Sequence, residues 1–215
     1  MADGARVPSG QNERVGEEQG SDPNGHSGRG EDGGAGGAGG AGGAGDRLFR
    51  VCFVCTGNIC RSPMADVVLR QLSGEATLAD GGALAGRLDI TSAGTGNWHA
   101  GEPMDPRARK ALARRGYHDH GHRARAFEAA WFDDTDLVVC LDRGHQQTLV
   151  SLARGRAGDD RYRDQLVMLR SFDPRAGGAV DVPDPYYGDD AEFEVCLDQV
   201  EAGCRGLTAY LLGRV

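Results

Sequence analysis

Short apolar segments recur along the chain from residue 47 onward, and longer segments with apolar residues at helical spacing separate them. The short segments are rich in β-favouring residues and are bounded by polar or turn-forming residues, as buried strands are. Four strands are therefore predicted, over residues 47–54, 88–92, 135–141 and 165–169.

The segments between and after these strands predict helices. The first helix opens at Ser62-Pro63, since proline is tolerated in the first turn. The second begins at Asp105-Pro106 and ends before Gly116, and a third covers about residues 142–153. The last helix has the clearest period, with apolar residues recurring from Phe193 to Leu211. Residues 73–86 are rich in glycine and alanine and are predicted to be a loop or a frayed helix end.

Strands that alternate with helices predict an α/β fold with a four-stranded parallel sheet and helices on both faces. In such sheets ligands bind beyond the carboxyl ends of the strands. The loop after the first strand is therefore where we expect the chemistry of this chain.

The first 46 residues have a different composition from the rest. They hold 16 of the 35 glycines, and the run from Gly33 to Gly45 has no side chain larger than alanine. Such a segment cannot bury enough apolar surface to offset its ordering entropy. We predict a disordered tail over residues 1–46 and one domain over residues 47–215.

Charge and composition exclude several classes of protein. The net charge of −8 divides into −5 for residues 1–46 and −3 for the rest, which argues against a general nucleic-acid binder. No apolar stretch approaches the roughly 18 residues of a membrane span. The first residues lack a basic stretch followed by an apolar one, so we expect no signal peptide. Six cysteines without a signal peptide predict reduced thiols in the cytoplasm. Lys110 is the one lysine beside many arginines, a bias typical of GC-rich bacterial genomes.

The loop that begins at Cys55 has the pattern of a phosphate-binding site. A strand-to-helix turn can aim successive backbone N–H groups at one anion, and Gly57 permits close backbone approach. Arg61 can bind two phosphate oxygens through its planar guanidinium. The same positive field favours Cys55 as a nucleophilic thiolate, which the hydroxyl of Ser62 could stabilise. It is not a Walker A loop, because no lysine precedes the serine.

Phosphoryl transfer to sulfur also needs a proton donor for the leaving oxygen. Asp184 is a candidate, since the proline that follows restricts its backbone and favours an ordered loop. Tyr186 and Tyr187 come next and could form the wall of a cleft for an aromatic ring. Alone, this segment could equally be a turn before the last helix, but the cysteine loop favours the functional interpretation.

Together these motifs resemble those of the low-molecular-weight protein tyrosine phosphatases. The chain is most similar to their actinobacterial branch in three stretches, C-T-G-N-I-C-R-S-P-M-A from Cys55, S-A-G-T-G-N-W-H from Ser92 and L-R-S-F-D-P from Leu169. The resemblance extends from Arg50 to about Leu211. It implies hydrolysis of phosphotyrosine in proteins, without a metal or other cofactor.

The resemblance also implies a role for each matching residue. Cys55 would form a phosphocysteine, Arg61 would hold the phosphate, and Ser62 would assist the thiolate. Asp184 would protonate the leaving tyrosine oxygen and then deprotonate the attacking water.

Other residues of the loop have implied supporting roles. The loop residues Thr56 to Ser62 would surround the phosphate. Asn58 would brace the loop with Ser92 as its partner, and Cys60 would form a reversible disulfide with Cys55 under oxidation. Trp98 and His99 follow the second strand and are expected to line the cleft, with surface packing as the alternative.

Three other functions fit the same loop less well. Arsenate reductases share the fold and the loop but need a relay of downstream cysteines on a mobile segment. A related phosphatase acts on phosphoarginine, which accompanies threonine at the position where this chain has Ile59. A pure binding module would have lost Cys55, Arg61 or Asp184, and all three are present. The substrate is therefore predicted to be a phosphotyrosine protein, with neither nucleic acid nor membrane as a partner and a monomer favoured.

The remaining cysteines are predicted to be packing residues. Cys52 lies inside the first strand, so Cys52-x-x-Cys55 is not expected to be a redox motif. Cys140 falls in the third strand, and Cys196 and Cys204 share the apolar face of the last helix, too far apart for a disulfide.

Two polar clusters have alternatives of their own. His118, His120 and His122 alternate beside a glycine, which favours a polar loop over a metal site because no ligand set completes one. The resemblance implies a structural role in the loop for His122. A basic face formed by Arg107, Lys110, Arg114 and Arg115 is expected to be solvated, with an acidic partner as the alternative.

Overall fold

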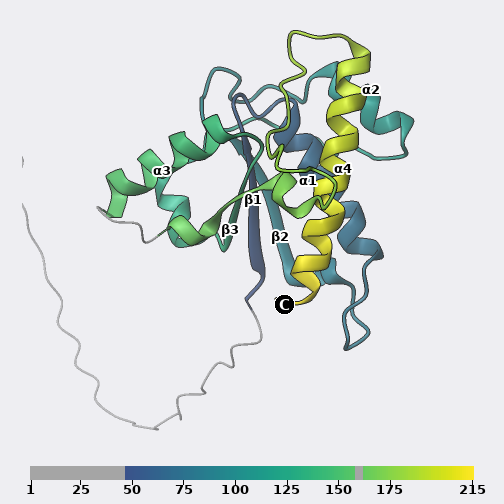
Figure 1. Ribbon diagram of the computed structural model, residues 1–215, viewed down its shortest axis with the longest axis vertical. Helices are drawn as coiled ribbons and strands as arrows, with labels where there is room; N and C mark the ends of the chain where they lie inside the picture. The colour runs from purple at the N-terminus through teal and green to yellow at the C-terminus, as the bar shows by residue number, and fades with distance from the viewer. Residues whose placement is uncertain (1–46, 158–161) are drawn as a thin grey trace, which may run out of the picture. The chain divides into compact units, whose positions relative to one another are not determined.

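The computed structural model describes residues 47–157 and 162–215 (Figure 1). The chain divides into two units, Met1–Gly42 and Gly43–Val215, and all described residues belong to the second. The tail predicted over residues 1–46 lies outside the described residues.

A four-stranded parallel sheet forms the centre of the described part, as predicted. Its strands are β1 (Phe49–Cys55), β2 (Leu88–Gly94), β3 (Leu137–Cys140) and β4 (Leu166–Met168). The order is β2-β1-β3-β4, and each neighbouring pair is parallel. Because β1 is central and apolar on both faces, its carboxyl end places Cys55 in the middle of the sheet edge.

Helices cover both faces of the sheet, which confirms the predicted fold class. They are α1 (Arg61–Glu75), α2 (Pro106–Arg114), α3 (Arg143–Ala157) and α4 (Asp190–Leu212). Figure 1 shows α1, α2 and α4 on one side of the sheet and α3 on the other. The sheet accordingly separates two apolar cores, one beneath α1 and α4 and one beneath α3. Within the described residues, no helix is long and apolar enough to cross a membrane.

The first helix and the segment after it differ from the prediction. Helix α1 begins at Arg61, one residue before the predicted start, and its third residue is Pro63, whose missing N–H is not needed in a first turn. After Glu75, an antiparallel bridge joins Thr77 to Ala83, and a short 3₁₀ helix, η1, covers Leu84–Arg87. This Gly/Ala-rich connection is ordered because Leu84 is fully buried in the core beneath α1.

Four cysteines outside the loop are packing residues, as predicted. Cys52 and Cys140 are buried in the core beneath α3, and Cys196 and Cys204 lie on the buried face of α4. Burial raises the pKa of all four thiols, that of Cys52 to about 12. These side chains are therefore neutral, apolar components of the cores.

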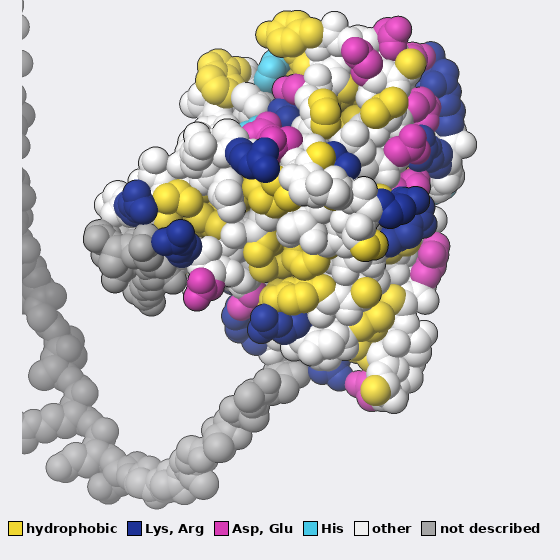
Figure 2. All heavy atoms as spheres, in the orientation of Figure 1, with side chains coloured by type: hydrophobic (Ala, Val, Ile, Leu, Met, Phe, Trp, Pro, Cys, Tyr) yellow, Lys and Arg dark blue, Asp and Glu magenta, His cyan; other side chains and the backbone are white. Residues whose placement is uncertain are grey.

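The basic face of α2 is exposed to solvent at Lys110 and Arg114, as expected, and acidic residues of α4 pair with it. Lys110 and Arg114 form ion pairs with Asp190, and Arg115 is paired with Glu194. Along the edge of the molecule where α2 and α4 lie, Figure 2 shows basic and acidic side chains interleaved. The basic residues thus attach α2 to α4.

The outer edge of β2 is occupied by arginine side chains. Arg70 of α1 donates a hydrogen bond to the carbonyl oxygen of Ile90, and Arg125 Nε donates to that of Ser92 at 3.1 Å. Arg125 also lies over the ring of Trp131, 4.8 Å from its centroid. Two outward-facing carbonyl groups of this strand therefore have side-chain donors.

Candidate active site

The loop between β1 and α1 presents unused hydrogen-bond donors. Residues 57–62 have backbone N–H groups that no described residue accepts. The helix that follows adds the positive end of its dipole, and its first residue, Arg61, is a further cation. Asn58 adopts φ = 56°, the left-handed conformation that turns the loop. The arrangement is a site for an anion.

Asn58 braces the loop, but not through Ser92. Its Nδ2 donates to Ser62 Oγ at 2.9 Å, and its Oδ1 accepts from the backbone N–H of Arg125 at 3.0 Å. The expected Asn58–Ser92 contact is wrong, because the left-handed turn directs the amide toward the start of α1. Ser92 contributes its carbonyl oxygen to Arg125 instead. The backbone carbonyl of Asn58 lies 2.7 Å from Nε2 of His122, which gives that histidine its structural place in the loop.

Cys55 is buried at the floor of the loop beside a hydroxyl group. Its Sγ lies 3.0 Å from Ser62 Oγ. Because Asn58 donates to that oxygen, the single proton of Ser62 remains for one of two acceptors, Cys55 Sγ or the Ala93 carbonyl at 3.2 Å. A thiolate at Cys55 would attract this proton and be stabilised by it.

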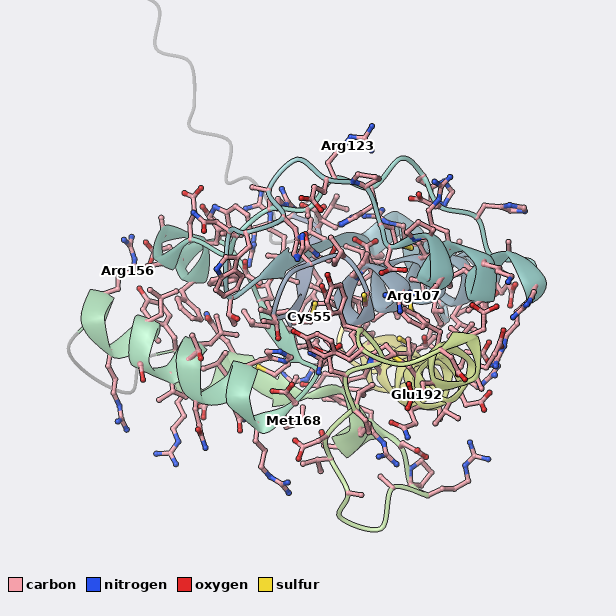
Figure 3. The ribbon with its side chains drawn as sticks, turned by 90° about the horizontal axis from the view of Figure 1, so that it is seen from above. Cys55, Arg107, Arg123, Arg156, Met168 and Glu192 are labelled. Atoms are coloured by element: carbon pink, nitrogen blue, oxygen red, sulfur yellow. The ribbon has the colours of Figure 1, made fainter. Side chains whose placement is uncertain are left out.

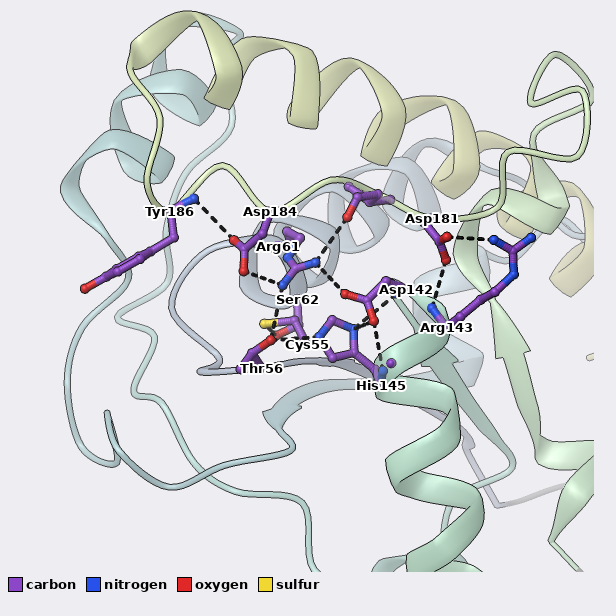
Figure 4. Close-up of polar contacts among 12 residues, drawn as sticks. Cys55, Thr56, Arg61, Ser62, Asp142, Arg143, His145, Asp181, Asp184 and Tyr186 are labelled. Carbon is purple, nitrogen blue, oxygen red and sulfur yellow. Dashed lines mark hydrogen bonds and ion pairs between the residues drawn. The ribbon is translucent and has the colours of Figure 1, made fainter.

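The guanidinium of Arg61 is 3% exposed and reaches both sides of the cavity (Figure 4). Nη1 donates to Asp142 Oδ2 at 2.8 Å and to the Val182 carbonyl at 3.1 Å. Nη2 donates to Thr56 Oγ1 at 3.2 Å and to Asp184 Oδ2 at 2.7 Å. Nε is buried and finds no acceptor among the described residues. An unpaired buried donor is costly, so the position favours an incoming anion.

Asp184 lies far from the loop in the sequence but contacts it through Arg61. Figure 4 shows its carboxylate between Arg61 and the backbone N–H of Tyr186, which donates to Oδ1 at 3.2 Å. The side chain is 42% exposed, so water can reach it. The structure thus places the predicted acid next to the predicted phosphate ligand.

The loop opens into a cavity of about 320 Å³ with aromatic walls. Its lining includes Trp98, His99, Tyr186 and Tyr187, with the ring centroids of His99 and Tyr186 6.2 Å apart. Figure 3 looks down on this end of the sheet, with Cys55 near its centre. Trp98 lies so close over Gly96 that a Cβ there would come within 1.6 Å of the indole ring. The cleft predicted from sequence is therefore present, with Trp98 and Tyr187 largely exposed at its mouth.

Cys60, the second thiol of the loop, differs in its surroundings from Cys55. It is the N-cap residue of α1 and is only 4% exposed. Burial, with Asp105 nearby, raises the pKa of this thiol well above its ordinary range. Cys60 is therefore a neutral thiol in the loop.

Sequence reasoning missed two residues beside Arg61. Asp142 follows β3 and pairs with Arg61, while His145, three residues later, approaches Thr56. The position of Asp142 at the carboxyl end of a central strand was the available signal. His145 gave no such signal, because its neighbour Thr56 is 89 residues away.

The alternating histidines lie in a loop, as expected. Asp119 Oδ1 accepts from the backbone N–H groups of Gly121 and His122. Within the described residues, no group of three or more His, Cys, Asp and Glu side chains is arranged to hold a metal ion.

Comparison with known proteins identifies the family of this site. A family model described as low molecular weight phosphotyrosine protein phosphatase matches residues 50–214. The low molecular weight protein-tyrosine-phosphatase of Streptomyces coelicolor is 51% identical over 162 residues, which are 75% of this chain and 92% of that protein. Low molecular weight protein-tyrosine phosphatase A of Mycobacterium tuberculosis is 44% identical over 158 residues, 73% of this chain and 88% of that protein.

The fold agrees with this assignment. The crystal structure of YfkJ from Bacillus subtilis superposes with a TM-score of 0.67 and is 32% identical, with 80% of this chain and 99% of that chain covered. The family model covers the loop from Cys55 to Ser62, the residues that line the cavity, and residues 181–188 around Asp184, here called the acidic loop. The chain therefore belongs to the low-molecular-weight phosphotyrosine protein phosphatase family.

Proposed function

We propose that this chain hydrolyses phosphotyrosine in proteins through a phosphocysteine at Cys55. The observation that carries the proposal is the buried Nε–H of Arg61, which finds no acceptor in the described part of the chain. It lies beside Cys55, in a loop whose backbone N–H groups at residues 57–62 are likewise not accepted by any described residue. A phosphoryl group has the charge and the oxygen atoms to satisfy all these donors at once.

In the first step, the Cys55 thiolate forms a bond to phosphorus while the bond from phosphorus to the tyrosine oxygen breaks. Asp184, protonated, gives its proton to the departing phenolate oxygen. Ser62 stabilises the thiolate before attack through its hydroxyl, 3.0 Å from the sulfur. The electron pair that bonded the oxygen leaves with the phenol, so the step needs no other reactant.

Substrate binding rearranges one contact of Arg61. Nη2 now donates to Asp184, whereas a bound phosphate would engage both Nε and Nη2 in bidentate fashion. Asp142 holds the opposite corner of the guanidinium and keeps its plane in place during this exchange. Binding thus frees Asp184 for proton transfer.

In the second step, water attacks the phosphocysteine. Asp184, now a carboxylate, takes the proton from water as the new oxygen–phosphorus bond forms. The sulfur–phosphorus bond breaks, and Cys55 leaves as a thiolate that Ser62 again stabilises. The products are inorganic phosphate and the original enzyme.

The cleft supports an aromatic phosphoester as the substrate. Its aromatic walls suit a phenyl ring, and the apolar side chain of Ile59 lies in the lining. Ile59 leaves little room for a guanidinium and offers it no hydroxyl, so phosphoarginine is disfavoured. Replacing Ile59→Thr should raise the ratio of phosphoarginine to phosphotyrosine turnover, and an unchanged ratio would remove this specificity argument.

Arsenate reduction is disfavoured by the downstream cysteines. Cys140 lies in β3, and Cys196 and Cys204 lie on the buried face of α4, where burial raises the pKa of each thiol. A redox relay requires reactive thiolates that can move to the loop.

The decisive assay measures phosphate release from a phosphotyrosine peptide in the presence of EDTA. We expect release by the wild type, none by Cys55→Ser, and none from matched phosphoserine or phosphoarginine peptides. The Cys55→Ser variant should still bind inorganic phosphate, because the loop donors remain. Release by Cys55→Ser at the wild-type rate would refute the cysteine mechanism.

Three properties remain predictions from the sequence. We propose that the enzyme acts in the bacterial cytoplasm, as a monomer, on a phosphotyrosine protein substrate. Size-exclusion chromatography with light scattering would test the oligomeric state.

A further inference from the structure

His145 is a buried histidine that the proposed mechanism does not use. It lies in the first turn of α3 and is 4% exposed. Its Nε2 lies 2.9 Å from Oγ1 of Thr56, the residue that follows the nucleophile (Figure 4). A ring from the opposite face of the sheet thus touches the phosphate-binding loop.

The surroundings of His145 determine which ring nitrogen carries the proton. The backbone N–H of Asp142 donates to Nδ1 at 3.1 Å, so Nδ1 presents its lone pair. Asp142 Oδ1 lies 3.2 Å from Nδ1, but it already accepts from the backbone N–H of His145 at 2.8 Å. Burial and the nearby Arg61 cation lower the pKa of His145 to about 4, so the ring is neutral with its proton on Nε2.

The hydroxyl of Thr56 therefore receives two hydrogen bonds. One comes from His145 Nε2 at 2.9 Å and one from Arg61 Nη2 at 3.2 Å. Two donors occupy both lone pairs of the oxygen, so its own proton must point elsewhere. Thr56 and Cys55 line the same cavity, so we infer that this proton is available to a ligand bound there.

We propose that His145 is a positioning residue, which fixes the Thr56 hydroxyl as a hydrogen-bond donor to a phosphoryl oxygen. The inference rests on the proposed function, because the phosphoryl group is that of the substrate. The same donor would serve any tetrahedral oxyanion in the loop, including inorganic phosphate. Thr56 then adds a side-chain donor to the backbone donors of the loop.

His145 also has a structural role that an experiment must separate. Asp142 and His145 bond reciprocally, side chain to backbone, in the manner of a capping box at the start of α3. An Asn side chain can place an acceptor where Nδ1 lies but cannot reach Thr56. A Gln side chain is longer and can carry an amide N–H to the position of Nε2. The two amides therefore separate capping from positioning.

The test combines His145→Asn with Thr56→Val in a double-mutant cycle on the full chain. We measure kcat/KM for a phosphotyrosine peptide and the calorimetric Kd for inorganic phosphate. Each single variant should weaken both by about tenfold, the effect of one charge-assisted hydrogen bond. The double variant should have the same kcat/KM and the same phosphate Kd as Thr56→Val. Losses that multiply in the double variant would overturn the proposal.

Further variants complete the design. His145→Gln should recover most of the loss of His145→Asn. A loss in His145→Gln with none in His145→Asn would indicate capping alone and would overturn the proposal. In the Thr56→Ser background, which keeps a hydroxyl, His145→Asn should again cost about tenfold. Thr148→Val removes an exposed threonine hydroxyl of α3 and should leave both constants unchanged.

Phosphate affinity separates this proposal from the proposed function. If the wild type binds phosphate but releases none from the peptide, the proposed function fails while the cycle on Kd still tests His145. Wild-type phosphate affinity retained in Thr56→Val would overturn the positioning role by itself.

Discussion

Some donor groups of Arg61 bind acceptors of the protein, and others are available to a ligand. Nη1 is committed to Asp142 and to the Val182 carbonyl, which fixes the guanidinium plane. Nη2 bonds to Asp184, and Nε has no acceptor among the described residues. A ligand in the cavity can therefore accept from Nε and can replace Asp184 as an acceptor of Nη2.

The role of Asp184 as an acid gives a prediction that depends on the leaving group. Asp184→Asn keeps a hydrogen-bonding side chain but cannot transfer a proton. We expect kcat to fall by about 10² to 10⁴ for a phosphotyrosine peptide, whose phenol is a poor leaving group, and by much less for p-nitrophenyl phosphate. Steady-state kinetics on both substrates would measure this. Equal losses for the two substrates would exclude the acid role.

The two thiols of the loop give a redox prediction. Hydrogen peroxide would oxidise the Cys55 thiolate to a sulfenic acid, and the Cys60 thiol would then condense with it to a disulfide with loss of water. Mild peroxide should therefore inactivate the wild type, and dithiothreitol should restore activity. In Cys60→Ser, recovery should be impaired because Cys55 can oxidise further. Full recovery of this variant would argue against the disulfide.

Most site residues could be predicted from the sequence, because the loop is continuous. Cys55 to Ser62 form one motif, and Asp184 has its own signature beside a proline. The partner of Asn58 was predicted wrongly, since side-chain direction depends on its left-handed φ. Asp142 and His145 are brought to the site only by the sheet order, which places β3 next to β1.

At the scale of elements, the start of α2 connects the phosphate loop to the acidic loop. The backbone N–H of Asp105, the N-cap of α2, donates to the Ile59 carbonyl at 2.8 Å. Its carboxylate binds Arg107, whose Nη1 donates to the Gly188 carbonyl at 2.9 Å. Arg107 also lies 5.7 Å from the ring centroid of Tyr186. One side chain thus fixes the segment that follows Asp184.

Loss of this connection should affect catalysis more than stability. Arg107→Met keeps an unbranched apolar stem but removes the contacts to Asp105 and Gly188. We expect kcat/KM to fall by about tenfold, as the loop bearing Asp184 and Tyr186 loses one charge-assisted hydrogen bond. Arg109→Met, on the same helix but paired with Asp119, should be nearly neutral. Equal losses of kcat/KM in the two variants would show that the loss comes from a general disturbance of α2, and not from the contacts of Arg107 to Asp105 and Gly188.

Element boundaries could be predicted wherever a local signal marked them. Asp105 and Gly116 enclose α2 as expected, with Gly116 at φ = 78°. The connection from residue 76 to residue 87 could not be predicted, because its order depends on the burial of Leu84 rather than on its composition. The basic face of α2 was similarly ambiguous until α4 supplied its acidic partners.

At the scale of the whole molecule, the buried His145 makes stability depend on pH. Its pKa is about 4 in the folded state and about 6.5 when unfolded. Between these values the unfolded chain binds a proton that the folded protein does not, so stability falls as pH falls from 6.5 to 4. The shift corresponds to about 3 kcal/mol at most.

Urea unfolding at pH 7, 6, 5 and 4.5 would measure this dependence. The free energy of unfolding of His145→Gln should decline less than that of the wild type over this range, because the variant has no group to titrate at this position. Carboxylates with lowered pKa, such as Asp105, contribute to both proteins and cancel in the difference. Parallel curves for the two proteins would show that His145 is not the source.

The arginines at the edge of β2 have a consequence for how the molecule behaves among its copies. A bare strand edge is a template on which another chain can add a strand, and such growth leads to aggregates. Arg70 and Arg125 occupy the carbonyl oxygens of Ile90 and Ser92 and bring positive charge to the same line. A second chain would have to displace both guanidinium groups before it could extend the sheet. The two arginines thereby oppose intermolecular strand addition at this edge.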